Sequence, residues 1–385
     1  MTPSILPRTL PGLLWLHIYL FATLVSAYKP LSDSFLRAIP PAGPEDFDIK
    51  TGKLLAPILI PRVPGTPGQT TTQRHFVDFF TRELPKWTIE WQNSTGTTPV
   101  NGMAPIPVEN LIIKREPPWV KPGEANLLTL VAHYDSKSKY DSRKQIMEGF
   151  IGATDSAAPC AMLMHTARSI DKYITQMHDE MAELQEGGTV EMDMGVQILL
   201  LDGEEAFVDW TSTDSTYGSR RVSLAETWES SYNPPSSKFY KYRTPLSQIS
   251  VFMLLDLLGA ASPRVPSYFP TTHWAYKNLA TIESRLRGLN LLESTPKEPF
   301  LPDLDGAMGK YSGISDDHLP FIGRGVPILH VIPSPFPDQW HQMTDDGEHL
   351  DMPSVKDWSK IVTAFALEWL DMMEVWTEPG QRKMS

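Results

Sequence analysis

Residues 196–205 read VQILLLDGEE, and this stretch is the most informative feature of the chain. Its first six residues are mostly aliphatic and begin with a β-branched side chain, which predicts a short buried strand. Glu204 and Glu205 follow where that strand ends, and two adjacent carboxylates are costly to bury without partners. A metal ion is one partner that would justify them. One glutamate could ligate the ion while its neighbour transfers protons.

Polar residues also follow the other apolar runs of the chain. In open α/β sheets the ligand crevice lies at the carboxyl ends of the strands, so these residues are expected to gather at one edge. A solvated loop would instead scatter charges without regard to strand order. The runs and the residues that follow them are 127–132 with His133, Tyr134, Asp135 and Ser136, 252–255 with Asp256, and 326–332 with Trp340 and His341.

The pattern of the whole chain predicts an α/β fold. Helical periodicities alternate with short apolar runs, which favours a three-layer sandwich with a central mixed, mainly parallel sheet flanked by helices. Residues 28–75 are rich in proline and glycine and are expected to wrap the surface. No shift in composition marks a second domain, so 28–385 is predicted to be a single catalytic domain. The expected strands are 110–115, 126–132, 196–201, 249–255 and 326–332, and the expected helices are 76–84, 156–184, 271–289 and 354–373.

The N-terminus has the features of a secretory signal. Arg8 precedes an apolar run at 13–25, and the small residues Ser26 and Ala27 permit cleavage. The run is short for a bilayer span of about 20 residues, which favours secretion over an uncleaved signal-anchor that would retain the protein in the Golgi. Residues 1–27 are therefore predicted to be a signal peptide, and the sequon at Asn93 agrees with that route.

The formal charge of −12 excludes function classes that need a basic surface. Nucleic acids and anionic membranes both attract basic faces, so neither is expected as a partner of the mature protein. Cys160 is the only cysteine, which rules out an intrachain disulfide. It lies in an apolar helical pattern and is interpreted as a small buried side chain rather than a nucleophile.

Asp155, Glu205 and His341 are the predicted metal ligands. Catalytic zinc usually keeps three protein ligands and one open position, and two carboxylates with one neutral histidine balance its charge. Glu204 then remains beside the metal as the general acid and base. Adjacent residues of an extended chain point to opposite sides, and Gly203 eases the turn that two neighbouring glutamates need.

Several of these residues have a second interpretation. Asp155 precedes an apolar helical pattern and could simply cap that helix, unless Ser156 caps it and leaves Asp155 free. The acidic residues of 315–318 are either a hydrated turn or a hydrogen-bonded support for the metal site. Trp340 is either a core residue or, because it directly precedes a proposed ligand, a wall of the substrate pocket.

The ordered series of motifs resembles the glutaminyl-peptide cyclotransferases (glutaminyl cyclases), a branch of the M28 zinc aminopeptidase-like family. Any one motif is weak, but their order makes the series specific. The resemblance covers roughly residues 70–375. The matching stretches are HYDSK at 133–137, GATDSAAPCAM at 152–162, DGEEAF at 202–207, DSTYGSR at 214–220, LLDLLGA at 254–260, DDHLPF at 316–321, RGVPILHVIPSPFP at 324–337 and WH at 340–341.

The resemblance implies an activity: cyclisation of N-terminal glutamine, and weakly of glutamate, to pyroglutamate, with loss of ammonia from glutamine. One zinc ion per chain would polarise the γ-carbonyl, and Glu204 would move a proton from the attacking amine to the leaving nitrogen. No other cofactor is expected. The partners would be peptide and protein N-termini that bear glutamine, the protein is expected to be a monomer, and activity should be best at mildly alkaline pH.

The resemblance also assigns roles to further residues. His133 matches a position that ligates a second metal in the dizinc aminopeptidases. Ala132 departs from the pattern, because secreted animal members have a cysteine there that pairs with the one matching Cys160. The family's catalytic residues match Glu204, Asp256 and Asp316, its substrate-binding aromatic residues match Trp210, Phe336 and Trp340, and its metal ligands match Asp155, Glu205 and His341.

Two rival functions are open at this point. A dizinc aminopeptidase of the same fold is the alternative, because His133 and Asp256 could complete a second metal site. The preference for a cyclase depends on residues 316–321 and 333–341. A non-enzymatic binding protein on this scaffold would be expected to have lost a ligand or Glu204, and this chain has kept them.

Overall fold

The computed structural model describes residues 29–100, 104–138, 148–184, 193–220, 224–230, 242–302 and 313–374. At its centre is one six-stranded sheet in the order β1-β2-β4-β3-β5-β6. The pairings of β1 with β2 and of β2 with β4 are antiparallel, and the other pairings are parallel. The strands are β1 Thr88–Thr97, β2 Pro105–Arg115, β3 Asn126–His133, β4 Met194–Leu201, β5 Ile249–Leu255 and β6 Ile328–Val331.

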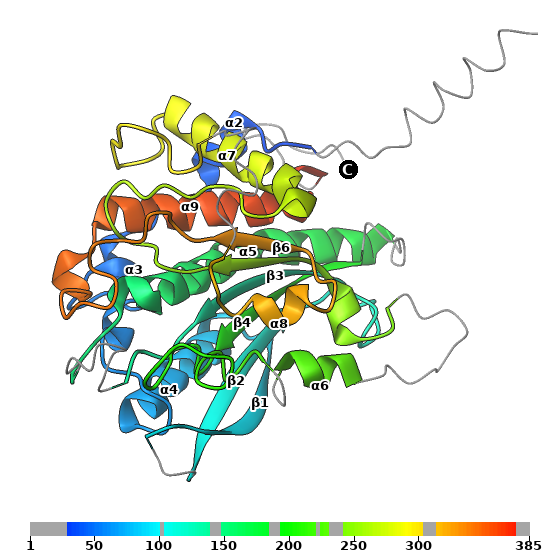
Figure 1. Ribbon diagram of the computed structural model, residues 1–385. Helices are drawn as coiled ribbons and strands as arrows, with labels where there is room; N and C mark the ends of the chain where they lie inside the picture. The colour runs from blue at the N-terminus through cyan, green and yellow to red at the C-terminus, as the bar shows by residue number, and fades with distance from the viewer. Residues whose placement is uncertain are drawn as a thin grey trace, which may run out of the picture.

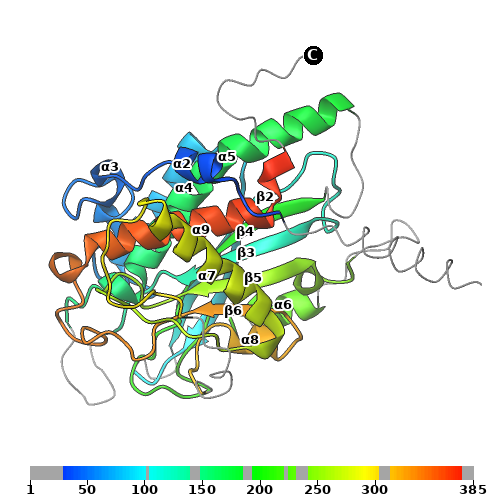
Figure 2. The same ribbon diagram turned by 90° about the horizontal axis from the view of Figure 1, so that it is seen from above.

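Helices cover both faces of this sheet, which gives the predicted three-layer sandwich (Figure 1). Figure 2 shows α5, α7 and α9 over one face. Leu128, Leu130 and Ala132 of β3 point into the core beneath them, whereas Val131 packs on the opposite face with Phe321 of α8. Burial on both faces explains why the parallel strands are continuous apolar runs. The longer helices are α4 Pro67–Glu83, α5 Ala158–Leu184, α7 His273–Gly288 and α9 Met352–Trp369, and the shorter ones on the opposite face are α6 Leu224–Ser230 and α8 Leu319–Ile322.

Residues 29–66 do more than wrap the surface, which corrects the expectation from their composition. Phe35 and Phe47 are fully buried in the main core. Arg62 is also fully buried, and its guanidinium donates to the backbone carbonyl of Tyr134 at 2.6 Å. This segment is therefore part of the folded core. It contains two short helices, α2 Asp33–Ala38 and α3 Pro44–Phe47.

The sequence interpretation missed β1 and the first half of α4. β1 is an edge strand whose residues are exposed or half-buried, so it lacks the apolar run that marks the other strands. The first turns of α4 bury polar side chains in place of apolar ones. Gln69 donates to Asp202 at 2.5 Å, and Gln73 donates to the hydroxyl of Tyr134 at 2.7 Å.

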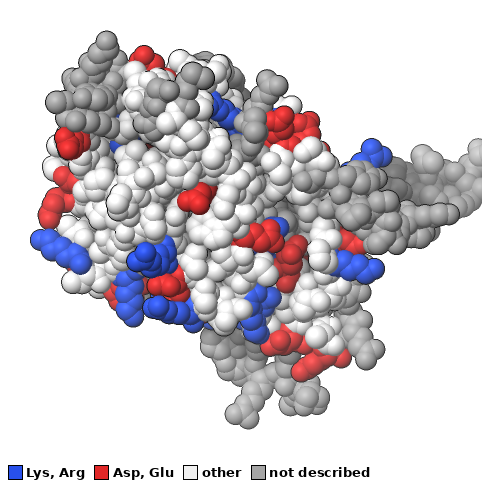
Figure 3. Space-filling model, turned by 90° about the horizontal axis from the view of Figure 1, so that it is seen from below, with Lys and Arg blue, Asp and Glu red and all other residues white. Residues whose placement is uncertain are grey.

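Several other sequence features can also be placed. The predicted signal peptide at 1–27 lies outside the described residues, and within the described ranges no helix is long and apolar enough to cross a membrane. Asn93 is exposed on β1. Cys160 is buried as expected, and burial raises the pKa of its thiol to about 12. Acidic and basic side chains are interspersed over the face seen in Figure 3.

Candidate active site

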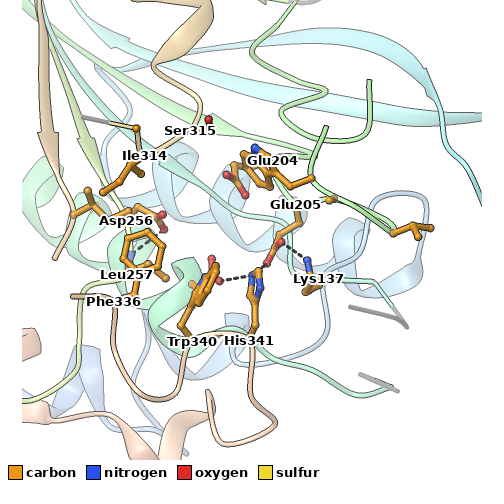
Figure 4. A pocket seen from close by; sticks show the side chains of 16 residues that line it. Lys137, Glu204, Glu205, Asp256, Leu257, Ile314, Ser315, Phe336, Trp340 and His341 are labelled. Atoms are coloured by element: carbon orange, nitrogen blue, oxygen red, sulfur yellow. Dashed lines mark hydrogen bonds and ion pairs between the residues drawn. The ribbon is translucent and has the colours of Figure 1, made fainter. Parts of the chain in front are cut away.

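The candidate site is a cavity of about 350 Å³ at the carboxyl edge of the parallel strands. The loops that follow β3, β4, β5 and β6 all contribute to its lining, as the placement of the polar residues predicts. Figure 4 shows Lys137, Glu205 and His341 in a row on one side of the cavity. Asp256 and Phe336 lie on the opposite side.

Gly203 and Asp135 shape the turn that presents the two glutamates. Gly203 has a φ of 68°, in the left-handed region, and a Cβ there would lie 3.0 Å from Tyr217. The carboxylate of Asp135 accepts hydrogen bonds from the backbone N–H of Glu204 at 3.0 Å and of Glu205 at 3.1 Å. The bend brings both glutamates to the cavity, at different places on its wall (Figure 4).

Asp155, Glu205 and His341 come together beside this turn, and we call them the outer cluster. Nε2 of His341 lies 3.4 Å from Oδ2 of Asp155 and 3.2 Å from Oε1 of Glu205. Burial alone would lower the pKa of His341, but the carboxylates of Glu205 and Asp155 raise it to about 9. The outer cluster therefore stabilises a positive charge at this point.

Two oxygens of the outer cluster make no hydrogen bond with any described residue: Oδ2 of Asp155 and Oε1 of Glu205. Both are buried, both face His341, and ligand atoms of the three residues lie within 4.8 Å of one another. Buried carboxylate oxygens are costly unless they are paired. Two carboxylates and an imidazole are ligands that catalytic zinc accepts. The residues of the outer cluster thus fit a metal ion.

Lys137 holds the remaining oxygen of Glu205. Its Nζ lies 2.9 Å from Oε2 of Glu205, and both side chains are buried. Burial alone would raise the pKa of Glu205, but Lys137 and then His341 overcome this effect and lower it. The carboxylate therefore stays ionised, with Oε2 occupied by Lys137 and Oε1 directed toward His341.

Asp155 lies in an irregular turn before α5, where it and Ser156 have non-helical φ and ψ angles. The peptide bond between these two residues is cis. Ser156 does not cap the helix, so the interpretation in which Ser156 supplies the cap is wrong. Its hydroxyl is hydrogen-bonded to the carboxylate of Asp256. Asp155 itself points to His341 and to His133.

Asp345 ties the turn that carries Asp155 to the loop that carries His341. Its backbone carbonyl accepts the N–H of Ala153 at 3.0 Å. Its Oδ1 accepts both the N–H and the hydroxyl of Thr154, at 2.8 and 2.9 Å. Asp345 is itself buried, and burial raises its pKa to about 7. The relative position of two outer-cluster residues therefore depends on this side chain.

A second group, which we call the inner cluster, consists of His133, Asp155 and Asp256. Nε2 of His133 lies 3.0 Å from Oδ1 of Asp155 and 3.4 Å from Oδ1 of Asp256. Its Nδ1 lies 3.3 Å from Asp135. Oδ1 of Asp256 also receives the hydroxyl of Ser156, and burial raises the pKa of Asp256 to about 6. The polar atoms that meet in the inner cluster are thus paired with one another.

Glu204 lies beside the outer cluster and is only 5% exposed. Burial raises its pKa well above the usual range; His133 opposes this effect, and the carboxylates of Asp316 and Glu205 reinforce it. A carboxyl group with a raised pKa can both accept and release a proton near neutral pH. This is the property that a general acid and base requires.

Asp316, His318 and His330 form a third group behind the cavity, which we call the rear cluster. Oδ2 of Asp316 lies 2.7 Å from Nε2 of His330, and the neighbouring Asp317 accepts the hydroxyl of Ser219 at 2.5 Å. Burial lowers the pKa of His318 to about 3 and that of His330 to about 4, so both stay neutral. A buried network agrees with a supporting role, and the hydrated turn was the wrong alternative.

Three aromatic side chains line the cavity: Trp210, Phe336 and Trp340. Trp340 packs edge-on against Phe336 with 4.9 Å between ring centroids, and it stacks on His341 at 4.2 Å. Trp210 and Trp340 are each 39% exposed, so neither is a core residue. Aromatic faces that stay open at a cavity are suited to form its walls for a ligand.

Comparisons with known proteins identify the family. The model of peptidase family M28 matches residues 110–366. A glutaminyl-peptide cyclotransferase of Gloydius blomhoffii is 37% identical over 320 residues, covering 83% of this chain and 80% of the relative. The chain belongs to the glutaminyl-peptide cyclotransferases of peptidase family M28. The resemblance found in the sequence motifs is thereby confirmed.

Further relatives of this cyclotransferase agree. A glutaminyl-peptide cyclotransferase-like protein of Bos taurus is 38% identical over 320 residues, covering 83% of this chain and 74% of the relative. The crystal structure of the Macrostomum lignano glutaminyl cyclase matches with a TM-score of 0.69 at 27% identity, covering 90% of this chain and 96% of the other. A leucine aminopeptidase precursor from Bacteroides thetaiotaomicron shares the fold, with a TM-score of 0.56 at 17% identity over 85% of this chain and 97% of the other.

The sequence did not reveal the roles of three residues in the site of this cyclotransferase. Asp135 and Lys137 stand in the motif at 133–137, which pointed to the site but not to what each residue contacts. No motif or pattern in the sequence marked Asp345 as part of the site. Its contact with Thr154 joins residues 191 positions apart, and only the folded chain brings them together.

Proposed function

We propose that this cyclotransferase uses zinc to convert the N-terminal glutamine of peptides and proteins to pyroglutamate with release of ammonia, and acts more weakly on glutamate. The observation that carries the proposal is the pair of buried carboxylate oxygens on Asp155 and Glu205 that face His341 and make no hydrogen bond with the described residues. Glu204, with its raised pKa, lies beside them in the same cavity. This combination supports metal-assisted chemistry with a separate group for proton transfer.

Asp155, Glu205 and His341 would hold one zinc ion per chain. When bound, zinc supplies a Lewis acid that polarises the γ-carbonyl of the substrate glutamine. Lys137 would keep Glu205 ionised and fix its orientation through Oε2. Asp345 would hold the turn of Asp155 in register with His341.

Glu204 would transfer the protons. The neutral α-amine of the substrate attacks the side-chain amide carbon, and a carbon–nitrogen bond forms as ionised Glu204 accepts a proton from that amine. Glu204 then donates this proton to the amide nitrogen, the original carbon–nitrogen bond breaks, and ammonia leaves. Because burial raises the pKa of Glu204, the same carboxyl group suits both the acceptance and the return of the proton.

Asp256 and Asp316 would support these steps through hydrogen bonds. Asp256 lines the cavity and is held by Ser156, so it is placed to orient the reacting amine. Asp316 is buried and is held by His330. Trp210, Phe336 and Trp340 would form the walls that bind the substrate.

A dizinc aminopeptidase is the second candidate, because one observation favours it. Ligand atoms of His133, Asp155 and Asp256 lie within 4.8 Å of one another, which is the geometry of a possible second metal site. Against it, the nitrogens of His133 are already engaged by Asp155 and Asp135, and Asp256 is engaged by Ser156.

Ammonia release from a peptide with N-terminal glutamine tests the two candidates. We expect turnover in a coupled assay, its loss with a zinc chelator, and its return when about one equivalent of zinc per chain is added. A peptide with N-terminal leucine serves as the control and should release no leucine. Two tightly bound zinc ions per chain together with leucine release would overturn the cyclase proposal.

We further propose that the chain enters the secretory pathway, with residues 1–27 as a signal peptide or, alternatively, a Golgi signal-anchor, and with 28–385 as one monomeric catalytic domain. The exposed position of Asn93 supports a glycan at its sequon. Expression in eukaryotic cells tests this proposal. A secreted product that loses mass on treatment with a glycosidase is expected, and Asn93→Gln should remove that change.

A further inference from the structure

A second hollow lies next to the cavity and shares two of its walls. It has a volume of about 500 Å³ and is lined by residues of 210–220, in the loop after β4, and by residues 315–324, which include α8. Trp210 and Ser315 line both this hollow and the cavity. We call the hollow the side groove. Because the two spaces share these residues, the side groove lies directly beside the cavity.

The chemistry of the side groove differs from that of the cavity. The described residues that line it include two arginines, Arg220 and Arg324, and no acid. The cavity, by contrast, is lined by four carboxylates. The side groove also has apolar contact surface, since Leu319 is 46% exposed and Trp210 forms part of the wall. It offers positive charge, hydroxyl groups and an exposed apolar wall together.

The two arginines are held in place by the protein. Arg220 donates to the backbone carbonyls of Ser212 at 2.6 Å and of Thr213 at 2.9 Å. Arg324 donates through Nε to Glu229 at 2.8 Å and through Nη1 to the carbonyl of Pro320 at 2.9 Å. These bonds leave Nη2 of Arg324 without a partner among the described residues. A guanidinium that is held in place and has an unused N–H donor is preorganised to bind an acidic ligand.

We propose that the side groove binds the part of the substrate peptide that follows its N-terminal glutamine and favours an acidic side chain there. This inference rests on the proposed cyclisation at the neighbouring cavity. Each extended residue spans about 3.3 Å, so a peptide of several residues extends beyond a cavity of about 350 Å³. Trp210 and Ser315 border both spaces, so the side groove with Arg324 lies directly beside the cavity, where these residues can enter it.

Two tetrapeptide amides that differ at one position test the proposal. One is Gln-Ala-Glu-Ala-NH₂ and the other is Gln-Ala-Lys-Ala-NH₂. We expect the acidic peptide to have roughly fivefold higher kcat/KM, mainly through a lower KM, because attraction to exposed charges contributes modestly. Raised ionic strength should reduce this ratio, since it screens such pairs. Arg324→Gln should bring the ratio close to one, and the matched control Arg82→Gln, on the exposed side of α4, should leave it unchanged.

Calorimetric binding of the same peptides to Glu204→Gln separates this inference from the proposed function. Tighter binding of the acidic peptide supports the side groove, even if the wild-type protein releases no ammonia and the cyclase proposal fails. Equal affinities and equal kcat/KM values for the two peptides in the wild-type protein, with normal ammonia release, would overturn the side groove and leave the cyclase proposal standing. The wild-type comparison decides the question even if Arg324→Gln does not fold.

Discussion

The outer and inner clusters share Asp155 and have the same donor types, yet their surroundings differ. In the outer cluster, two buried carboxylate oxygens make no hydrogen bond with the described residues, and His341 borders the cavity. In the inner cluster, His133 has no exposed surface and its ring nitrogens are engaged by acids on both sides. The same ligand types therefore produce one group with two oxygens that make no hydrogen bond to the described residues and one group in which the polar atoms that meet are hydrogen-bonded to protein partners.

This difference shows that residue type alone does not define a metal site. Buried carboxylates require partners, and the partner is either another protein group or an ion. Ser156 and Asp135 supply protein partners to the inner cluster. Lys137 occupies only one oxygen of Glu205, so the outer cluster keeps its second oxygen for a ligand.

The largest expected effect is that of His341→Ala, which removes the only nitrogen ligand of the outer cluster. We expect zinc content to fall close to zero and activity to fall by roughly a thousandfold or more, because metal polarisation is worth several kcal/mol. Elemental analysis and the ammonia assay measure the two effects. His349→Ala, at an exposed histidine, is the matched control. Retention of one zinc per chain by His341→Ala would argue for binding at the inner cluster instead.

Glu204→Gln should separate proton transfer from metal binding. Loss of a general acid and base costs roughly 10²–10⁴-fold in kcat, and zinc content should stay at the wild-type level. Glu205→Gln, one position away, should lose zinc as well, because it changes an outer-cluster carboxylate. Measuring kcat and zinc content for both variants distinguishes the proton-transfer role of Glu204 from the metal-binding role of Glu205. Ammonia release by Glu204→Gln at nearly the wild-type rate would contradict the assigned role.

Asp345→Ala should weaken metal binding by the outer cluster, although Asp345 is not one of its three residues. Loss of the bonds to Thr154 frees the turn of Asp155, and the loss of such supporting groups lowers metal affinity by about 10–100-fold. Zinc affinity measured by competition with a fluorescent chelator tests this expectation. Asp345→Asn keeps an oxygen acceptor and should remain close to the wild-type protein. Equal zinc affinities for the alanine variant and the wild-type protein would show that Asp345 does not position the site.

The last expected effect leaves the metal site unchanged and concerns acid sensitivity and the rear cluster. Burial lowers the pKa of His318 from 6.5 to about 3 and that of His330 to about 4. As the pH falls, the unfolded chain takes up protons on these histidines before the folded protein does. The stability that the neutral histidines contribute is therefore fully present above pH 6.5 and is lost as the pH falls toward 4 for His330 and toward 3 for His318. Each histidine should cost about 2 kcal/mol of unfolding free energy near pH 5.

Urea unfolding at two pH values measures this loss, with a chelator present so that release of zinc does not contribute. His318→Gln should show a smaller decrease in unfolding free energy on acidification than the wild-type protein. If both proteins lost the same free energy, His318 would not be responsible for the acid sensitivity.

The sequence predicted the parallel half of the sheet well, because β3, β4 and β5 are apolar runs buried on both faces. It did not predict β1 or the start of α4, where polar side chains face water or are buried through hydrogen bonds. Strand order also predicted which loops supply polar residues to the cavity, although none of residues 133–136 lines it. It could not predict which oxygens stay unpaired, because the contact of Lys137 with Glu205 depends on loop geometry in three dimensions.

The free edge of β1 bears on self-association of this protein. β1 pairs with β2 along its full length, and no described strand covers its other side. An uncovered edge of this length is a template on which another chain can add a strand and begin an aggregate. Asn93 lies near the middle of that edge and is exposed. A sugar chain attached there would sterically hinder another chain from pairing with this edge, and would so reduce aggregation at high protein concentration.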